Sequence, residues 1–560
     1  STRLHRSRFW RVRSICSYAV GGAICLCWQR HFGSSFFTHH GITQTTGMES
    51  PSIPSALHVL RISSRTCSAL FEARGQDVVG ASVPKLRLPR RRLSHVSMLL
   101  FFGAIFLILS AWAMATPLLG GPDEPQHMVK AQALVRGDFD NPFKGPYIPA
   151  GGQNCYAGQP TVTADCAELP WPERTRTIET ATENYPPVYH ALIGPITLVT
   201  DGKWRGYGMR LVSILACSLL LTLGLRTLLR LRSHPVAIVG ALFALTPMTI
   251  HLMSTVSPSS LAVATSFLLG ATLLALRSTQ TVGRFLIHQL GFAANLLLLL
   301  RRDSVLWVAV IGVFGLLFVP WSRIREVATD KSMFLWLPMT GVSIALQLIL
   351  WGGKSSTDFI KSGKEQSDVF VHGTWLGLAN LNDYVSQTVG KFGWLDVPLP
   401  GQLYTLLYFA LGGFVFLGLV SGARRLSISI GVGVTMWIGA AAVIGYLRFP
   451  YFQGRYAIGF ALCVLLACAV AISEGDLPRK VESRFVAVFG VIFLVGQVFS
   501  YLQNIRRYAV GLTGTWFSYR NAAWSPPYFG WWLPLIVLIV GLALASWMVV
   551  QSHRELQRAL

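Results

Sequence analysis

Residues 94–114 read SHVSMLLFFGAIFLILSAWAM and directly follow Arg90, Arg91 and Arg92 with one leucine between. Roughly 20 apolar residues suffice for a helix to cross the hydrocarbon core of a bilayer. Backbone groups in lipid must be paired internally, and a helix meets that requirement by itself. The stretch therefore predicts a transmembrane helix, and the preceding arginines predict that its start lies in the cytoplasm.

The same composition extends along most of the chain. Of the 560 residues, 52% are hydrophobic and 13% are charged, whereas a soluble domain carries about 25% charged residues. Apolar runs recur as far as Val550, whereas a strand barrel would show alternating segments of about 10 residues. We predict an all-α integral membrane protein with about 12 transmembrane helices (roughly 11–13). The other predicted spans cover residues 207–225, 236–253, 261–276, 285–300, 305–321, 333–351, 403–420, 427–447, 456–472, 485–503 and 532–550.

The net charge of +23 fits a membrane protein rather than a nucleic-acid-binding one. Lys and Arg cluster in short loops beside the spans, as the positive-inside rule expects, and no nucleic-acid-binding motif is present. The apolar segment 186–200 is shorter than the usual minimum for a span. If it crossed, the later basic clusters would lie outside, so we predict that it stays at the outer interface. Both termini are then cytoplasmic.

Residues 1–92 differ from the rest of the chain. They mix Arg, Ser, His and Cys without sustained periodicity. We interpret them as a poorly ordered basic cytoplasmic tail, or as an extension upstream of the true start, which would be Met48 or a later codon. The polytopic membrane domain is predicted to cover residues 93–560. Its outer segments are predicted near residues 116–206, 352–402 and 504–531.

Candidate catalytic residues follow the first span. Residues 120–127 read GGPDEPQH and include Asp123, Glu124 and His127. Two adjacent carboxylates near a His could form an acid/base cluster, because desolvation at a membrane surface raises the proton affinity of a carboxylate. The alternative is a helix cap in which Asp123 accepts backbone N–H bonds. The spacing matches no metal-ligand pattern, so no metal site is predicted, although a divalent cation requirement stays open.

Arginines in predicted outer turns form a second group of candidates. Arg301 and Arg302 occupy a tight turn between two spans, and Arg455 ends the outer turn 448–455. These positions depart from the positive-inside pattern and therefore need a partner. A guanidinium group presents a planar fork that suits phosphate oxygens. Lipid headgroups or internal carboxylates are the alternative partners.

Three further candidates lie in the long outer segments. Tyr185 opens the short apolar segment and fits an interfacial aromatic belt. Trp394 could be an interfacial anchor or a surface on which a sugar stacks. Asp396 could serve as a second acid or could cap the next helix.

The cysteines are of two kinds. Cys217, Cys463 and Cys468 lie inside apolar spans, where a small buried hydrophobic residue is the ordinary interpretation. Cys155 and Cys166 share one polar segment and are candidates for a disulfide if that segment is extracytoplasmic. Loop composition does not establish the Cα distance that such a bond needs.

Four motifs, in order, resemble a bacterial multi-pass membrane family known as domain of unknown function 2142. Each motif alone is short, and the order and spacing of all four make the resemblance specific across residues 95–550. The motifs are GPDEPQH at 121–127, YPP at 185–187, FGWLD at 392–396 with LP at 399–400, and QGRY at 453–456.

The family in turn resembles the C-type glycosyltransferase superfamily (GT-C), whose members use polyprenyl-phosphate-linked sugars. The resemblance implies a GT-C-like fold, a glycan or lipid acceptor in the cell envelope, and a location in the bacterial plasma membrane. The catalytic base of that superfamily is an acidic residue after the first span, which matches Asp123 with Glu124 beside it. The resemblance also makes Arg455 a candidate phosphate ligand. One departure is the SPSS sequence at 257–260, where relatives often carry an acidic or Asn residue, so the acceptor could differ.

We therefore predict a membrane glycosyltransferase that acts at the extracytoplasmic face. Asp123 would take the proton of an acceptor hydroxyl. Arg455, with Arg301 or Arg302, would neutralise the leaving phosphate, and His127 and Trp394 would orient the sugar. The alternative is a non-enzymatic lipid or polysaccharide transporter, or a scaffold for envelope assembly. Few ionisable residues lie within the predicted spans and no inverted repeat is evident, which favours the enzyme.

Overall fold

The computed structural model describes most of the membrane domain. The chain divides into two units, Ser1–Leu86 and Arg87–Leu560, and every described residue belongs to the second. The predicted tail, residues 1–92, and residues 352–374 of the second predicted outer segment lie outside the described residues. The described residues are 95–147, 152–167, 175–182, 185–229, 235–351, 375, 377–448, 453–475, 477–516, 522–527 and 529–559.

Helices dominate the described residues, as predicted. The long and medium helices are α2 (His95–Ala115), α3 (Glu124–Leu134), α5 (Trp204–Leu229), α6 (Pro235–Ala244), α8 (Pro258–Ser278), α9 (Arg284–Leu298), α10 (Ser304–Phe318), α12 (Met333–Leu346), α15 (Gly401–Ser421), α16 (Arg424–Arg448), α17 (Ile458–Glu474), α18 (Arg479–Val510) and α19 (Trp532–Ala559). The short helices are α4 (Val188–Ile193), α7 (Pro247–Met253), α11 (Trp321–Thr329), α14 (Leu381–Val389), η1 (Gly152–Cys155), η2 (Ala164–Ala167), η3 (Gly194–Leu198), η4 (Gln347–Trp351) and η6 (Gly454–Ala457).

Two small antiparallel sheets complete the described elements. Strand β1 (Phe143–Gly145) pairs with β2 (Arg176–Ile178), so that Lys144 lies opposite Thr177. Strand β3 (Lys391–Phe392) pairs with β4 (Val397–Pro398) around the tight turn that carries Trp394. Both sheets belong to loops that the sequence predicts to be outer segments.

Each predicted span coincides with one helix or with two consecutive ones, but the number of crossings is not confirmed. Helix α10 has 15 residues, which extend only about 22 Å at 1.5 Å per residue, less than the roughly 30 Å of a bilayer core. Two bent helix pairs, α6 with α7 and α11 with α12, add up to two crossings to the seven helices named below if each pair is one span, which gives up to nine among the described residues. Seven described helices are long and apolar enough to cross: Ser97–Ala115, Trp204–Leu229, Pro258–Ser278, Gly401–Ser421, Gly454–Glu474, Arg479–Val510 and Trp532–Glu555.

The predicted span 236–253 is broken by a bend of 68° between α6 and α7. Pro247 begins α7, and proline is tolerated there because the first turn of a helix has no acceptor for its N–H. The Thr246 side chain caps the new helix by accepting a hydrogen bond from Thr249 N at 3.3 Å. Local cap chemistry therefore explains why one apolar run becomes two helices.

Small residues let the central helices approach closely. A Cβ atom on Gly240 of α6 would lie 2.7 Å from Ala469 Cβ of α17, and one on Gly418 of α15 would lie 2.8 Å from Cys468 Cβ. Such contacts are typical of helices that associate in a membrane, where van der Waals packing replaces the hydrophobic driving force. The predicted role of Cys463 and Cys468 as small buried residues is confirmed, since both are fully buried and free.

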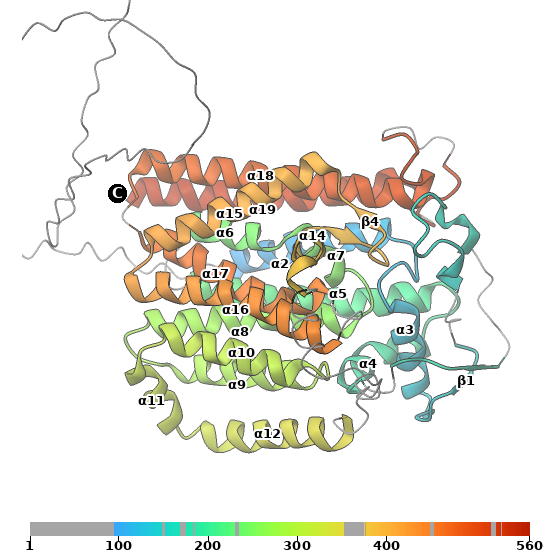
Figure 1. The fold of residues 1–560 in the computed structure, drawn as a ribbon, viewed down its shortest axis with the longest axis horizontal. Coiled ribbons are helices and arrows are strands. Elements are labelled where there is room, and N and C mark those ends of the chain that lie inside the picture. Colours follow the sequence, from blue (N-terminus) through green and yellow to red (C-terminus); the bar gives the residue numbers. More distant parts are fainter. Residues whose placement is uncertain are drawn as a thin grey trace, which may run out of the picture. The chain divides into compact units, whose positions relative to one another are not determined.

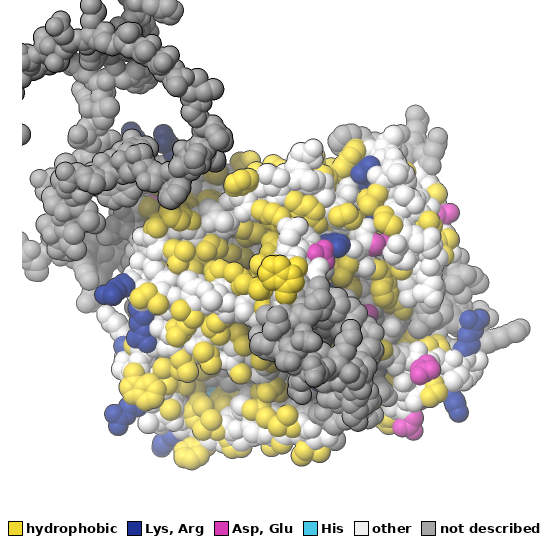
Figure 2. All heavy atoms as spheres, viewed as in Figure 1, with side chains coloured by type: hydrophobic (Ala, Val, Ile, Leu, Met, Phe, Trp, Pro, Cys, Tyr) yellow, Lys and Arg dark blue, Asp and Glu magenta, His cyan; other side chains and the backbone are white. Residues whose placement is uncertain are grey.

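Large apolar side chains on the outside of the helices match a lipid environment. Phe334 is 85% exposed, Phe409 79% and Ile349 77%. Figure 2 shows apolar side chains spread over much of one face. A soluble protein rarely exposes such extended apolar surface, so the outer surface of the helices favours the bilayer as its surroundings.

The long helices lie side by side with roughly aligned axes, with α3, α4 and β1 at one end and α11 at the other (Figure 1). At the α11 end, Arg277 forms an ion pair with Glu474 at 2.7 Å, and Arg425 donates to the carbonyl oxygen of Leu317. At the α3 end, the predicted outer segments contact one another. Loops predicted to be outer thus meet at one end of the helices, and Arg277 and Arg425 lie at the other.

Candidate functional site

The candidate site begins at the loop between α2 and α3. Asp123 is the N-cap residue of α3 and has a left-handed backbone, with φ at 59°, a conformation that Asp tolerates better than most residues. The loop packs tightly, because a Cβ atom on Gly121 would lie 2.7 Å from Thr255 Cβ. The Asp123 side chain makes no cap hydrogen bond and remains 38% exposed. Asp123 therefore occupies the N-cap position, but the predicted capping hydrogen bonds from its side chain to backbone N–H groups are not formed.

Arg455 is the ion-pair partner of Asp123. Its Nη2 donates to Asp123 Oδ2 at 2.8 Å, and its side chain is 4% exposed. Gly454 lets this turn approach α14, since a Cβ atom there would lie 2.2 Å from the carbonyl oxygen of Tyr384. Arg455 Nε is buried without a hydrogen-bond partner in the described part of the chain.

Arg301 lies beside Arg455, in the turn between α9 and α10. It forms a two-point ion pair with Asp303, with distances of 2.8 and 3.1 Å, and donates a hydrogen bond to Ser259 Oγ. The guanidinium groups of Arg301 and Arg455 lie 4.8 and 5.4 Å from the centre of the Tyr456 ring. Arg302 occupies the same turn and is half-buried. Of the three predicted phosphate ligands, Arg301 and Arg455 are brought together.

A small pocket, with a cavity volume of about 20 Å³, lies between these arginines. Ser304 Oγ lines it and, like Arg455 Nε, is buried with no partner among the described residues. Buried donors without partners are rare in folded proteins and often mark a site for a ligand or a water molecule. The other lining residues include Ser259, Arg301, Trp307, Tyr456 and Gly459.

Glu124, the neighbour of Asp123, has a different environment. It is fully buried and forms a two-point ion pair with Arg210 of α5, with distances of 2.8 and 2.7 Å. Its oxygens also accept backbone N–H bonds from Gly121 at 3.0 Å and Val256 at 2.9 Å. These four hydrogen bonds use the carboxylate fully, so Glu124 holds the loop in place and has no free oxygen for chemistry.

Arg210 is a residue that the sequence argument missed. It is 1% exposed and also donates to the carbonyl oxygens of Ala113, Thr116 and Pro117, at 2.6 to 2.7 Å. It thereby satisfies carbonyl groups that the end of α2 leaves unpaired. One sequence feature could have identified Arg210: it is a basic residue near the start of a predicted span. Charged residues inside spans pair with other groups, so a partner for Arg210 was to be expected.

His127 lies one helical turn beyond Asp123, and its backbone N–H donates to the Asp123 carbonyl at 3.2 Å. Its ring is 1% exposed and meets the Tyr185 ring edge-on at 4.9 Å. Burial and the positive charges of Arg301, Lys130 and Arg455 hold the pKa of His127 well below its usual value. His127 and Tyr185 therefore belong to the Asp123 cluster, with His127 in its neutral form.

Lys130 and His190 also belong to this cluster but were not among the predicted site residues. Lys130 Nζ donates to the carbonyl oxygens of Thr182 and Tyr185, each at 2.7 Å. His190 Nε2 lies 3.2 Å from His127 Nδ1. A histidine on a short apolar segment was visible in the sequence, but its pairing with His127 depends on how α4 packs against α3.

Trp394 and Asp396 belong to a second network. Trp394 Nε1 donates to the carbonyl oxygen of Leu119 at 3.1 Å, next to the loop that carries Asp123. Asp396 is 8% exposed and forms an ion pair with Arg507 of α18 at 2.9 Å. Its other oxygen accepts from Trp394 N at 3.1 Å. Asp396 is therefore a buried structural carboxylate in the turn between β3 and β4.

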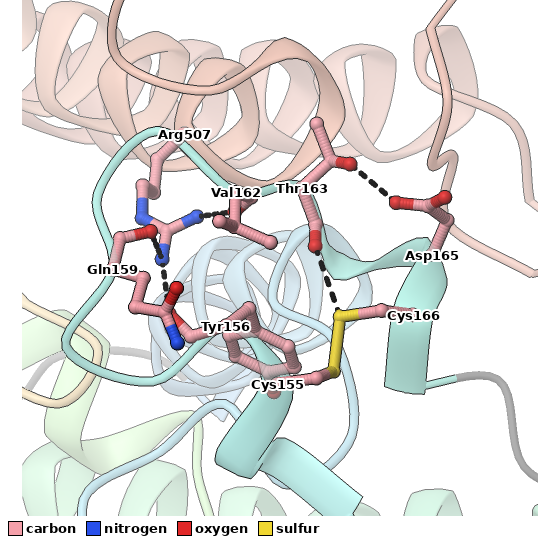
Figure 3. Close-up of a disulfide and its surroundings, with 8 residues drawn as sticks. All are labelled: Cys155, Tyr156, Gln159, Val162, Thr163, Asp165, Cys166 and Arg507. Carbon is pink, nitrogen blue, oxygen red and sulfur yellow. Dashed lines mark hydrogen bonds between the residues drawn. A yellow bond between two sulfur atoms is a disulfide. The ribbon is translucent and has the colours of Figure 1, made fainter.

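The structure joins Cys155 and Cys166 in a disulfide, with a Cα distance of 6.2 Å. Figure 3 shows Arg507 beside this disulfide-closed loop. Arg507 Nη2 donates to the carbonyl oxygens of Tyr156 and Gln159, at 2.7 and 3.0 Å. The loop thus closes around the arginine that holds Asp396.

Two solved structures of ArnT from Cupriavidus metallidurans are similar to this chain. The apo structure has 11% sequence identity and a TM-score of 0.43, and the match covers 81% of this chain and 76% of that one. The structure bound to undecaprenyl phosphate has 11% identity and a TM-score of 0.44, with 83% and 79% covered. No curated protein sequence matches the chain.

A family model described as "Predicted membrane protein (DUF2142)" matches residues 106–449, more than half of the chain. The match includes Asp123, Tyr185 and Trp394 with their motifs, and it ends before Arg455. The resemblance inferred from these motifs is confirmed. The chain belongs to the DUF2142 family of membrane proteins.

Proposed function

We propose that this protein is a membrane glycosyltransferase that transfers a sugar from a polyprenyl-phosphate donor to a cell-envelope acceptor. The observation that carries the proposal is the ion pair between Asp123 and Arg455 beside the pocket that Arg301 lines. A partly exposed carboxylate next to buried arginines supplies both groups that the reaction needs, a proton acceptor and a binding site for the leaving phosphate.

Asp123 is the general base in this proposal. Arg455 engages only Oδ2, and Oδ1 has no hydrogen-bond partner among the described residues. Oδ1 takes the proton of the acceptor hydroxyl as the oxygen of that hydroxyl attacks the anomeric carbon. The bond from the anomeric carbon to the donor phosphate oxygen breaks, and its electron pair leaves with the phosphate.

Arg455 and Arg301 stabilise the phosphate as it leaves. Arg455 Nε and Ser304 Oγ, both buried and unpartnered within the described part of the chain, are donors in fixed positions. Fixed donors strengthen the binding of the leaving phosphate in a site from which water is excluded, since they need no reorganisation during the reaction. Because Arg455 contacts both Asp123 and the donor phosphate in this proposal, binding of the donor also affects the environment of Asp123.

The proposal places this end of the helices at the extracytoplasmic face of the bacterial plasma membrane, with both termini in the cytoplasm. The disulfide between Cys155 and Cys166 supports this orientation, because disulfides persist mainly in oxidising compartments. The ion pair between Arg277 and Glu474 and the basic loop near Arg325 lie at the other end, as the positive-inside rule expects.

The test uses purified full-length protein in detergent with a polyprenyl-phosphate hexose and an envelope glycan extract as acceptor. We expect the wild type to consume the donor. Asp123→Asn should lower the rate by about 10²–10⁴-fold, the contribution of a positioned general base. Asp201→Asn is the matched control, because Asp201 lies at the same end with a side chain 99% exposed, and its rate should equal that of the wild type.

The assay also separates the proposal from the transporter alternative. A transporter leaves the polyprenyl-phosphate hexose chemically intact in detergent, whatever the variant. A correctly folded Asp123→Asn variant that transfers sugar at the normal rate would exclude Asp123 as the base.

A further inference from the structure

His127 and His190 form a buried chain of hydrogen bonds that ends on a backbone carbonyl. His190 Nδ1 lies 3.3 Å from the carbonyl oxygen of Pro186, and His190 Nε2 lies 3.2 Å from His127 Nδ1. The two rings are 0% and 1% exposed. The chain therefore connects the start of the short apolar segment to α3, the helix that follows Asp123.

The carbonyl oxygen fixes the direction of every hydrogen bond in this chain. A carbonyl can only accept, so His190 Nδ1 carries the hydrogen. A neutral imidazole has one N–H, which leaves His190 Nε2 as an acceptor, and His127 Nδ1 must then donate to it. The lone pair of a neutral His127 is therefore on Nε2. Burial and the positive charges of Arg301, Lys130 and Arg455 favour this neutral form.

The Nε2 atom of His127 accepts no hydrogen bond from any described residue; the ring's one hydrogen bond, through Nδ1, goes to His190. His127 lies one turn after Asp123 on α3, and Tyr185 holds its ring edge-on at 4.9 Å. Arg301, Arg455 and Lys130 lie nearby, and the hydrogen bonds described for them go to carboxylates, carbonyl oxygens, Ser259 and Tyr456 rather than to His127. A fixed acceptor beside the proposed base is thus left for a ligand.

We infer that His127 Nε2 accepts a hydrogen bond from a hydroxyl group of the donor sugar, and that His190 is the positioning residue that keeps this lone pair available. The identity of the ligand rests on the proposed function, whereas the tautomer of His127 does not. The pair would orient the sugar so that its anomeric carbon faces the hydroxyl that Asp123 deprotonates.

The tautomer is tested directly by solid-state NMR of the full-length protein in bilayers, with ¹⁵N-labelled histidine. The chain has 13 histidines, so the His127 signals are assigned by their loss in His127→Asn. We expect His127 to be protonated on Nδ1 and unprotonated on Nε2. His190→Gln should keep this pattern, because a side-chain carbonyl can replace His190 Nε2 as the acceptor, and His190→Leu should populate the other tautomer. A protonated Nε2 in the wild type, or an unchanged spectrum in His190→Leu, would overturn the inference.

A kinetic experiment tests the contact with the sugar. The loss of one neutral hydrogen bond should raise KM for a polyprenyl-phosphate hexose by about 2–10-fold in His127→Asn and His190→Leu. Inhibition by unsubstituted polyprenyl phosphate should not change, since this molecule has no sugar. His288→Leu is the control, because His288 is exposed on α9, near its start at the opposite end. Equal weakening of both ligands would indicate a general structural defect and overturn the inference.

The two experiments fail separately. A wild type that consumes no donor contradicts the proposed function, while the NMR spectra still decide the tautomer. An active wild type with the other tautomer leaves the proposed function intact and removes the role of His190.

Discussion

Asp123 and Glu124 are adjacent in sequence but differ in environment. Asp123 is 38% exposed, with one oxygen bound by Arg455, whereas Glu124 is fully buried and receives four hydrogen bonds. The backbone at the start of α3 explains the difference, because Asp123 is the N-cap residue with a left-handed conformation whereas Glu124 is the first helical residue, so the two side chains leave the chain in different directions. The sequence predicted a pair of carboxylates, and the packing of α5 against α2 makes one of them structural.

The variant Glu124→Gln should therefore lose stability. It leaves the buried guanidinium of Arg210 without its counter-charge, and breaking one side of a buried ion pair costs about 3–5 kcal/mol. We expect this decrease in the free energy of unfolding, measured by denaturation in detergent micelles. Combining it with Arg210→Met should restore part of the loss, since no unpaired charge then remains. A stable Glu124→Gln protein with strongly reduced sugar transfer would instead assign Glu124 to the chemistry.

At the scale of elements, the disulfide-closed loop links segments that are distant in sequence. The loop between Cys155 and Cys166 surrounds Arg507 of α18, which in turn holds Asp396 after strand β3. Trp394, in the same turn as Asp396, contacts the loop before Asp123 through Leu119. A change in the disulfide-closed loop therefore reaches the candidate site through Arg507, Asp396 and Trp394 in turn.

The double variant Cys155→Ser with Cys166→Ser should be less stable than the wild type by about 3 kcal/mol. The disulfide closes a loop with a sequence separation of 11 residues. Restricting a loop of that length in the unfolded chain lowers its entropy, which corresponds to about 3 kcal/mol of stability. The measurement is denaturation with and without reductant. Reductant should destabilise the wild type to the same extent and leave the double variant unchanged; a response of the double variant would show that reductant acts elsewhere.

Element boundaries show what hydropathy could and could not predict. The first span was predicted at 94–114 and α2 covers His95–Ala115, because a long apolar run has no competing structure in lipid. The break of the span 236–253 at Pro247 was not predicted, although proline and a capping threonine were visible. Helix α3 was predicted only as the alternative in which Asp123 caps a helix, since its buried polar residues follow no apolar period.

At the scale of the whole molecule, the topology of the helices decides which loops can meet. The predicted outer segments contact one another through Asp123 with Arg455 and through Asp396 with Arg507. The same alternation in the direction of successive helices places the basic loops at the opposite end of the helices. The orientation of the two ends relative to the cytoplasm is a prediction that labelling can check.

Single cysteines at the two ends should differ in their reaction with a membrane-impermeant maleimide in intact cells. Asp201→Cys, at the candidate site's end, should react before lysis, and Arg325→Cys should react only after lysis. Both native side chains are exposed, so access is controlled by the membrane alone. The background carries Ser at the cysteines of residues 1–92, which are Cys16, Cys25, Cys27 and Cys67. The reverse labelling pattern would place the candidate site in the cytoplasm.

The sequence by itself determined the helical membrane fold, the family and the position of most spans. These follow from hydropathy and short motifs, which depend on neighbouring residues only. The tertiary structure decided which carboxylate remains accessible, which arginine faces it across 332 residues of chain, and how the two histidines pair. Such contacts depend on the mutual packing of helices distant in sequence, and lipid-facing and protein-facing apolar residues are alike in hydropathy. For the same reason the number of crossings, predicted at about 12, did not follow from apolar runs alone.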